Sequence, residues 1–179
     1  MLSTRPTPGD YAEFYHTYVQ KVPSDISIIA CLEEALKKTS DWLNQLPADQ
    51  WEYRYAAGKW SIKELVLHLI DAERIFAYRA LRIARNDQTL LADFDENSYV
   101  PFSQADRRSP QSLIDEYMAV RSATISLFRN LPDEAWSYSG NMNHSKATTL
   151  ALAYIIAGHE MHHWQIIRER YLQSSQPIV

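Results

Sequence analysis

Cysteine is nearly absent from this sequence of 179 residues, which contains Cys31 alone. A single cysteine excludes a disulfide within the chain and a multi-cysteine metal site. Long apolar runs are also missing, because no stretch approaches the roughly 18 consecutive apolar residues of a membrane span. The first ten residues, MLSTRPTPGD, lack the apolar segment of a signal peptide. We therefore expect a cytoplasmic protein with no membrane partner.

The sequence also lacks an excess of positive charge. It has 18 Lys and Arg residues against 22 Asp and Glu residues, which gives a formal net charge of −4. Domains dedicated to nucleic acids are usually basic, so we expect no nucleic-acid partner. What is present is an ordinary globular composition with 46% hydrophobic residues, in a chain long enough for one domain.

Four long intervals without proline carry apolar residues at helical spacing. Pro47 ends the first interval because proline cannot continue the helical hydrogen bonds. Ser109 and Pro110 fit an N-cap followed by proline at the first helical position. Strand signals are poor, since no run of five residues alternates between β-branched and polar residues. We therefore predict an all-α four-helix bundle with helices at about 25–46, 62–85, 110–130 and 146–172.

The link between the second and third predicted helices, about 86–109, is long for a bundle. Such a link can cross from one end of the bundle to the other, so a simple up-down-up-down order is not assured. Residues 1–23 are aromatic and contain proline, and we expect them to form an arm packed on a bundle of residues 24–179.

Ser61 and Glu64 begin the second predicted helix and fit a capping box, in which each side chain binds a free backbone N–H. This interpretation makes Glu64 a structural residue rather than a catalytic one.

Histidines form the main candidate site. On a helix, His159 and His163 are one turn apart and leave from the same face. His68 lies in the apolar stretch of the second predicted helix and can supply a third ligand. Three buried imidazoles each need a polar partner, and one divalent ion would satisfy all three. The alternative is three separately packed histidines with ordinary hydrogen bonds.

Gly158 precedes the histidine pair. Glycine inside a helix costs about 1 kcal/mol relative to alanine, so we expect another segment to approach the backbone closely there.

The run from His159 to His163 also matches H-E-x-x-H, the pattern of zinc proteases. We reject that interpretation because the extended pattern requires a glycine and a histidine where this sequence has Ile166 and Glu169. Glu160 and His162 project about 100° away from the neighbouring ligands, so Glu160 is expected to serve packing or a neighbouring subunit. Their roles, like that of His16, stay open.

Several other side chains have two interpretations. Asp71 could orient an imidazole or pair with Arg168. Aromatic residues after the first helix could line a substrate pocket or a dimer face, but we prefer ordinary packing in the core and at the surface: Trp51, Tyr53 and Tyr55. The arginines near the end of the second helix favour a solvated face over a phosphate site: Arg79, Arg82 and Arg85. Cys31 fits a buried core thiol, and His144 lies too far along the chain from His159 to join the site.

The ordered motifs together resemble the DinB/YfiT-like metalloenzyme family. Residues 53–64 followed by His68 resemble its Trp-Ser-x-x-Glu-x-x-x-His signature, 94–100 its long connection and 157–163 its closing histidine motif. The resemblance implies a four-helix bundle of up-down-down-up order and a homodimer. It also implies a divalent metal, nickel or zinc, on His68, His159 and His163.

Some relatives transfer low-molecular-weight thiols to electrophiles, and others isomerise maleylpyruvate with a thiol cofactor. The resemblance therefore implies a metal-dependent thiol S-transferase acting on a small-molecule substrate. Alternatives are a metal-dependent hydrolase, for which we place no base in the sequence, and a non-catalytic bundle with a structural metal.

Overall fold

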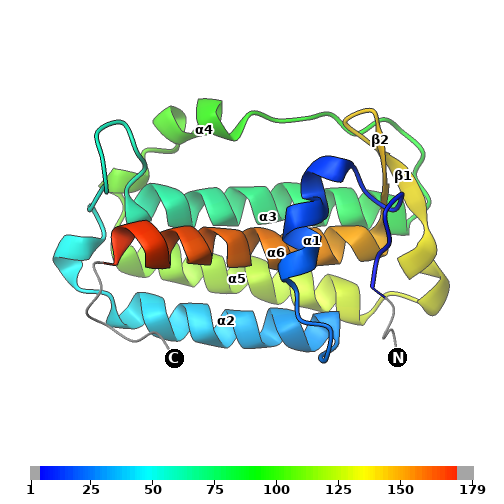
Figure 1. Ribbon diagram of the computed structural model, residues 1–179, viewed down its shortest axis with the longest axis horizontal. Coiled ribbons are helices and arrows are strands. Elements are labelled where there is room, and N and C mark those ends of the chain that lie inside the picture. Colours follow the sequence, from blue (N-terminus) through cyan, green and yellow to red (C-terminus); the bar gives the residue numbers. More distant parts are fainter. Residues whose placement is uncertain (1–4, 173–179) are drawn as a thin grey trace.

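The computed structural model describes residues 5–172, so the ends of the expected arm and bundle lie outside the described residues. The structure is mostly helical (Figure 1). Its α-helices are α1 (His16–Lys21), α2 (Ile28–Gln45), α3 (Ile62–Ala84), α4 (Glu96–Ser103), α5 (Pro110–Arg129) and α6 (Thr149–Ile166).

Side-chain caps fix where the four long helices begin. The cap residues each accept a hydrogen bond from a backbone N–H of the first turn: Ser27, Ser61, Ser109 and Thr148. At α3 the predicted capping box is confirmed, with Ser61 and Glu64 each bound to the other's backbone. The expected structural role of Glu64 follows from these two bonds.

The four long helices lie side by side, and each falls within one of the four predicted helical ranges (Figure 1). α3 packs against α5 and α6, and α2 packs against the same two helices. The sequence colours show that α2 and α6 run in one direction and that α3 and α5 run in the other. α6 begins three residues later than predicted and continues into a short π-helical turn, Ile167–Tyr171.

The all-α prediction is wrong for one segment. Strands β1 (Ser139–Met142) and β2 (Ser145–Thr148) form an antiparallel hairpin before α6. Asn143 and His144 both have positive φ, as in a type I′ turn, whose twist suits a tight hairpin. The strands have four residues each, too short for the alternation that sequence patterns detect.

The link between α3 and α5 runs back along the outside of α3 and carries α4 (Figure 1). It is attached to the hairpin through Leu91, whose backbone exchanges hydrogen bonds with Asn141 and Asn143. The link therefore forms an outer layer over α3 rather than a loose loop.

The N-terminal segment packs on the bundle through α1, which crosses α6 (Figure 1). At the crossing, a Cβ added to Gly158 would lie 2.0 Å from the carbonyl oxygen of Tyr18. The prediction that another segment approaches the backbone at Gly158 is thereby confirmed. Cys31 and Trp51 are buried in the core, as expected.

Candidate metal centre

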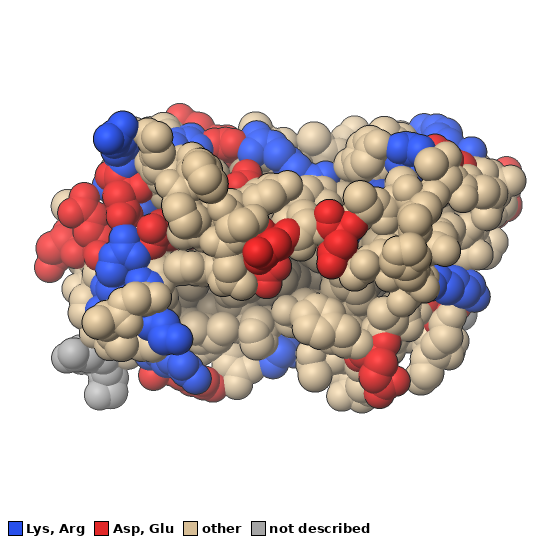
Figure 2. Space-filling view, turned by 90° about the horizontal axis from the view of Figure 1, so that it is seen from above, with Lys and Arg blue, Asp and Glu red and all other residues tan. Residues whose placement is uncertain are grey.

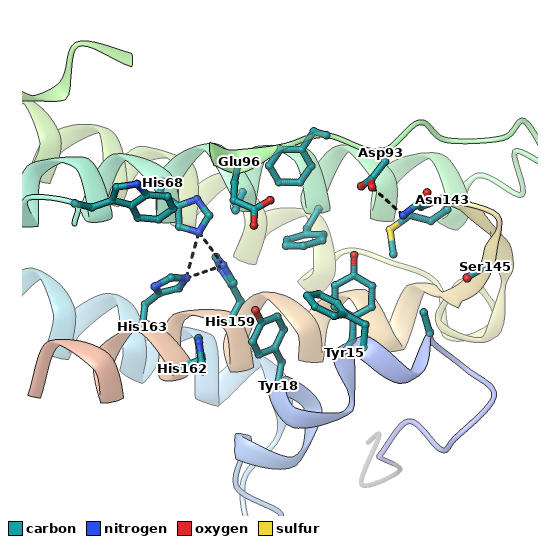
Figure 3. Close-up of a pocket in the computed structure, with 17 residues that line it drawn as sticks. Tyr15, Tyr18, His68, Asp93, Glu96, Asn143, Ser145, His159, His162 and His163 are labelled. Atoms are coloured by element: carbon teal, nitrogen blue, oxygen red, sulfur yellow. Dashed lines mark hydrogen bonds between the residues drawn. The ribbon is translucent and has the colours of Figure 1, made fainter. Parts of the chain in front are cut away.

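Three histidines from two helices converge at one point in the bundle. α3 supplies His68, and α6 supplies His159 and His163 (Figure 3). The Nε2 atom of His68 lies 3.1 Å from that of His159 and 3.2 Å from that of His163, and the last two are 3.1 Å apart. The three side chains predicted to be ligands are thus brought together, and all are buried.

Hydrogen bonds alone cannot satisfy this triangle. Each neutral imidazole Nε2 either donates one hydrogen or accepts one, so three mutual contacts leave at least one nitrogen without a proper partner. Histidine nitrogens about 2.0–2.1 Å from a shared ion lie roughly 2.9–3.4 Å from one another, depending on the coordination angle. The observed separations fall within that range, so the residues fit a divalent ion.

Burial holds the three histidines in the neutral state that a metal ligand requires. It lowers the pKa of His68 to about 4. Burial, followed by the nearby His68 and His162, lowers the pKa of His163 to about 3. The pKa of His159 is well below its ordinary value, again chiefly because of burial. The Nδ1 atom of His163 is buried and has no hydrogen-bond partner among the described residues.

A cavity of about 450 Å³ opens beside the histidines. Aromatic side chains from the N-terminal segment, the residue before the α3 cap, α3 and the link line much of it: Phe14, Tyr15, Tyr18, Trp60, Phe76 and Phe94. In Figure 3 the histidines lie at one end, and Asn143 and Ser145 of the hairpin lie at the other. The cavity therefore suits a small molecule with apolar parts.

The charged side chains that line the described cavity are acidic. Asp93 accepts a hydrogen bond of 2.9 Å from Asn143, and its carboxylate lies 3.8 Å from the buried guanidinium of Arg79. Glu96 points into the cavity (Figure 3) and has no ion-pair partner within residues 5–172. The face of the molecule seen in Figure 2 shows acidic groups near its middle, and most Lys and Arg residues lie nearer its edges.

Tyr18 lines the cavity beside the three clustered histidines. Its ring is edge-on to His159, with 5.4 Å between the ring centroids. Burial raises the pKa of the Tyr18 hydroxyl, so this group is a neutral hydrogen-bond donor near pH 7.

The remaining histidines stay outside the triangle. His162 lines the cavity but contributes no atom to the three-histidine cluster. His144 is exposed in the hairpin turn, and His16 bonds to Tyr11 and Gln20. The exclusion of His144 agrees with the structure, although our reason, distance along a continuous helix, was wrong because α6 begins after it.

Two interpretations of charged residues were wrong. Neither role suggested for Asp71 is found among the described contacts, because its carboxylate faces Arg74 on its own helix at 3.8 Å. Arg79 is not on a solvated face: its side chain is 2% exposed and packs against the rings of Phe76 and Phe94. Arg82 does form the expected surface ion pair, with Asp87.

Sequence reasoning missed the environment of Glu160. This carboxylate accepts hydrogen bonds from Thr39 (2.6 Å) and Tyr117 (2.8 Å), and lies 2.7 Å from Arg121. Although burial alone would raise the pKa of Glu160, the Arg121 charge and these bonds hold it below the ordinary value. We expected Glu160 to serve packing or a neighbouring subunit, but it belongs to a buried polar network within the chain.

The same arginine holds a second carboxylate. Arg121 makes two parallel bonds to Glu73, of 2.8 and 2.7 Å. One sequence signal could have revealed this network. Arg121 shares the helical face of Tyr117, Thr124 and Phe128, where the pattern calls for buried residues.

Sequence comparison places the protein in a family. The sequence profile of the DinB superfamily matches residues 32–167. The chain belongs to the DinB superfamily. A search of curated proteins finds no match.

Solved structures share the fold of this DinB-superfamily chain. YfiT from Bacillus subtilis, described as a probable metal-dependent hydrolase with an unusual four-helix bundle topology, aligns with a TM-score of 0.69 and 18% identity, over 82% of this chain and 91% of YfiT. A DinB-like protein from Bacillus subtilis, YjoA, aligns with a TM-score of 0.57 and 19% identity, over 80% of this chain and 89% of YjoA.

The mycothiol-dependent maleylpyruvate isomerase aligns with a TM-score of 0.63 and 11% identity, over 78% of this chain. This chain spans 60% of the length of that isomerase. At these identities the structural matches establish a common fold only.

Proposed function

We propose that this protein is a metal-dependent enzyme that transfers a low-molecular-weight thiol to an electrophilic small molecule. His68, His159 and His163 would hold a divalent transition metal, nickel or zinc. The observation that carries the proposal is the triangle of three neutral Nε2 atoms, 3.1–3.2 Å apart, at one end of an aromatic cavity.

A bound ion would supply the acidity that deprotonates a coordinated thiol. The sulfur of that thiol would then bond to an electrophilic carbon of the substrate, the leaving group would depart with its electron pair, and the thiol proton would pass to solvent. No protein thiol is needed for this chemistry. Cys31 is itself unsuited to it, because burial raises its pKa to about 11.

The chain's own residues would bind and orient the electrophile. Phe76, Phe94 and the tyrosines offer apolar surface to its carbon skeleton and exclude water from it. The neutral Tyr18 hydroxyl is placed to donate a hydrogen bond to an oxygen of the substrate beside His159. The thiol dependence of the structurally similar maleylpyruvate isomerase supports thiol chemistry on this fold.

Hydrolysis is the second candidate. Glu96 lines the cavity, has no ion-pair partner within residues 5–172, and offers the general base that we could not place from the sequence. The description of YfiT as a probable metal-dependent hydrolase supports this alternative.

We also propose, from the family resemblance, that the chain forms a homodimer in the cytoplasm. The bundle order up-down-down-up belongs to the same proposal, and the shared direction of α3 and α5 supports it (Figure 1).

A dye-coupling assay separates these functions. Protein loaded with zinc or nickel and protein stripped with a chelator would be mixed with cysteamine, cysteine or glutathione and an aryl chloride dye. Transfer predicts a thioether product that disappears on stripping and in the His163→Ala variant. Thiol consumption at the same rate with and without metal would contradict metal-dependent transfer. Metal-dependent release of the aryl alcohol from an aryl ester without any thiol would establish hydrolysis. Loss of helical circular dichroism on stripping would instead show that the metal is structural.

A further inference from the structure

The buried network around Arg121 joins all four long helices. Thr39 comes from α2, Glu73 from α3, Arg121 from α5 and Glu160 from α6. Each of these side chains is at most 4% exposed. The indole of Trp164 on α6 extends the network with a 2.9 Å bond to the Thr39 hydroxyl.

Stability alone is a weak reason for such a network. Removing charges from water costs several kcal/mol for each ion, and apolar side chains of similar volume are often equally or more stabilising. The surrounding core is built from such apolar residues, for example Leu32 and Ile155. Three charged groups in this place therefore point to a further role.

The carboxylates of the network lie on the same two helices as the metal-site histidines. Glu160 follows His159 directly on α6, and Glu73 lies five residues after His68 on α3. Both carboxylates bind one guanidinium, that of Arg121, at 2.7–2.8 Å. Rotating or sliding either helix would break these bonds, so Arg121 holds the two ligand-bearing helices in a fixed register.

We propose that Glu73, Arg121 and Glu160 are positioning residues of the metal centre, which fix the register of its ligands. The inference rests on the metal binding proposed above. It assigns to Glu160 a task distinct from that of the zinc-protease glutamate, because its carboxylate is bound to Thr39, Tyr117 and Arg121 inside the core.

Two charge-neutral variants test this inference. Glu160→Gln keeps an oxygen for Thr39 and Tyr117 while removing the charge, and Glu73→Gln makes the same change on α3. Both should bind Zn²⁺ about tenfold more weakly than the wild type, because weaker contacts to Arg121 would no longer hold α3 and α6 in the register that aligns the ligands. The affinity would be measured by competition with a chromophoric chelator. The visible spectrum of bound Co²⁺ would report on ligand geometry.

Phe128→Leu on α5 is the matched control, because Phe128 packs against Trp136 away from the histidines. It should lower the thermal midpoint of the metal-free protein without changing zinc affinity or the Co²⁺ spectrum. If the two glutamine variants likewise lower only the midpoint, the network is merely structural and this inference is overturned. If the wild type itself binds no Zn²⁺ or Co²⁺, the proposed function fails first, and this inference fails with it.

Discussion

The backbone carbonyl of Tyr18 lies directly against the Cα of Gly158, where an added Cβ would lie 2.0 Å from the carbonyl oxygen. This contact seats α1 on α6 one residue before His159. It also sets the position of the Tyr18 ring against the imidazole of His159. The packing of a peripheral helix and the shape of the cavity thus depend on one hydrogen atom in place of a side chain.

Gly158→Ala should therefore destabilise the protein by about 1–3 kcal/mol, the usual cost of overpacking. Without the α1 contact the sign would be opposite, because alanine favours a helix by about 1 kcal/mol over glycine. Denaturant unfolding would measure the change, and limited proteolysis would report release of the N-terminal segment. A variant as stable as the wild type, or more so, would show that α1 does not pack at Gly158.

Alanine at His68, His159 or His163 should each reduce bound zinc or nickel to background in elemental analysis. His162→Ala should retain the metal because its side chain takes no part in the triangle. Added Zn²⁺ at a hundred times its dissociation constant should stabilise the wild type by about 2.7 kcal/mol, and the three ligand variants far less. Unchanged metal content in any of the three would refute the site.

The metal-free protein should lose stability as the pH falls below neutral. The folded-state pKa values of His68 and His163, about 4 and about 3, lie below the ordinary value near 6.5. At pH values between the folded-state pKa values and about 6.5, the unfolded chain binds protons that the folded chain does not, so acid favours unfolding. At pH 5 each of these two histidines should lower the free energy of unfolding by about 2 kcal/mol relative to pH 7.

Urea unfolding of chelated protein at both pH values would measure this loss. His68→Gln should reduce the difference between them, whereas His144→Gln, in the exposed hairpin turn, should leave it intact. Equal stability of the wild type at pH 7 and pH 5 would contradict the prediction.

Cys31 should not react with a disulfide dye at pH 8 while the protein is folded. Its side chain is 2% exposed, and burial raises its pKa to about 11, so hardly any thiolate forms. In urea the same thiol should react fully, which serves as the control. Rapid reaction of the native protein would reopen the possibility of a protein nucleophile.

The sequence predicted the helices because their end signals are local. The side chains of Ser61 and Glu64 reach only the first turn of α3, and proline acts within one turn of its own position. The clustering of the histidines was predictable for a related reason: His159 and His163 share a helix face by spacing alone. We added His68 to that pair on chemical grounds, because buried imidazoles need polar partners and one ion could serve all three.

What the sequence did not reveal depends on contacts between distant segments. The roles of Glu160 and Arg79 are set by residues far along the chain, namely Arg121 for the first and Asp93 for the second. Each side chain looks like ordinary surface charge when only its neighbours in sequence are known. The hairpin was missed because its turn contains Asn143 and His144 instead of the Asn-Gly that usually marks such a turn.

The walls of the cavity come largely from segments outside the four long helices: the N-terminal arm, the link with α4, and the hairpin. The histidines, by contrast, sit entirely on α3 and α6. In the proposed enzyme, selectivity can consequently diverge by exchanging or lengthening those outer segments while the chemistry inside the bundle is inherited intact. Grafting such segments between relatives offers a route to new substrates on one unaltered scaffold.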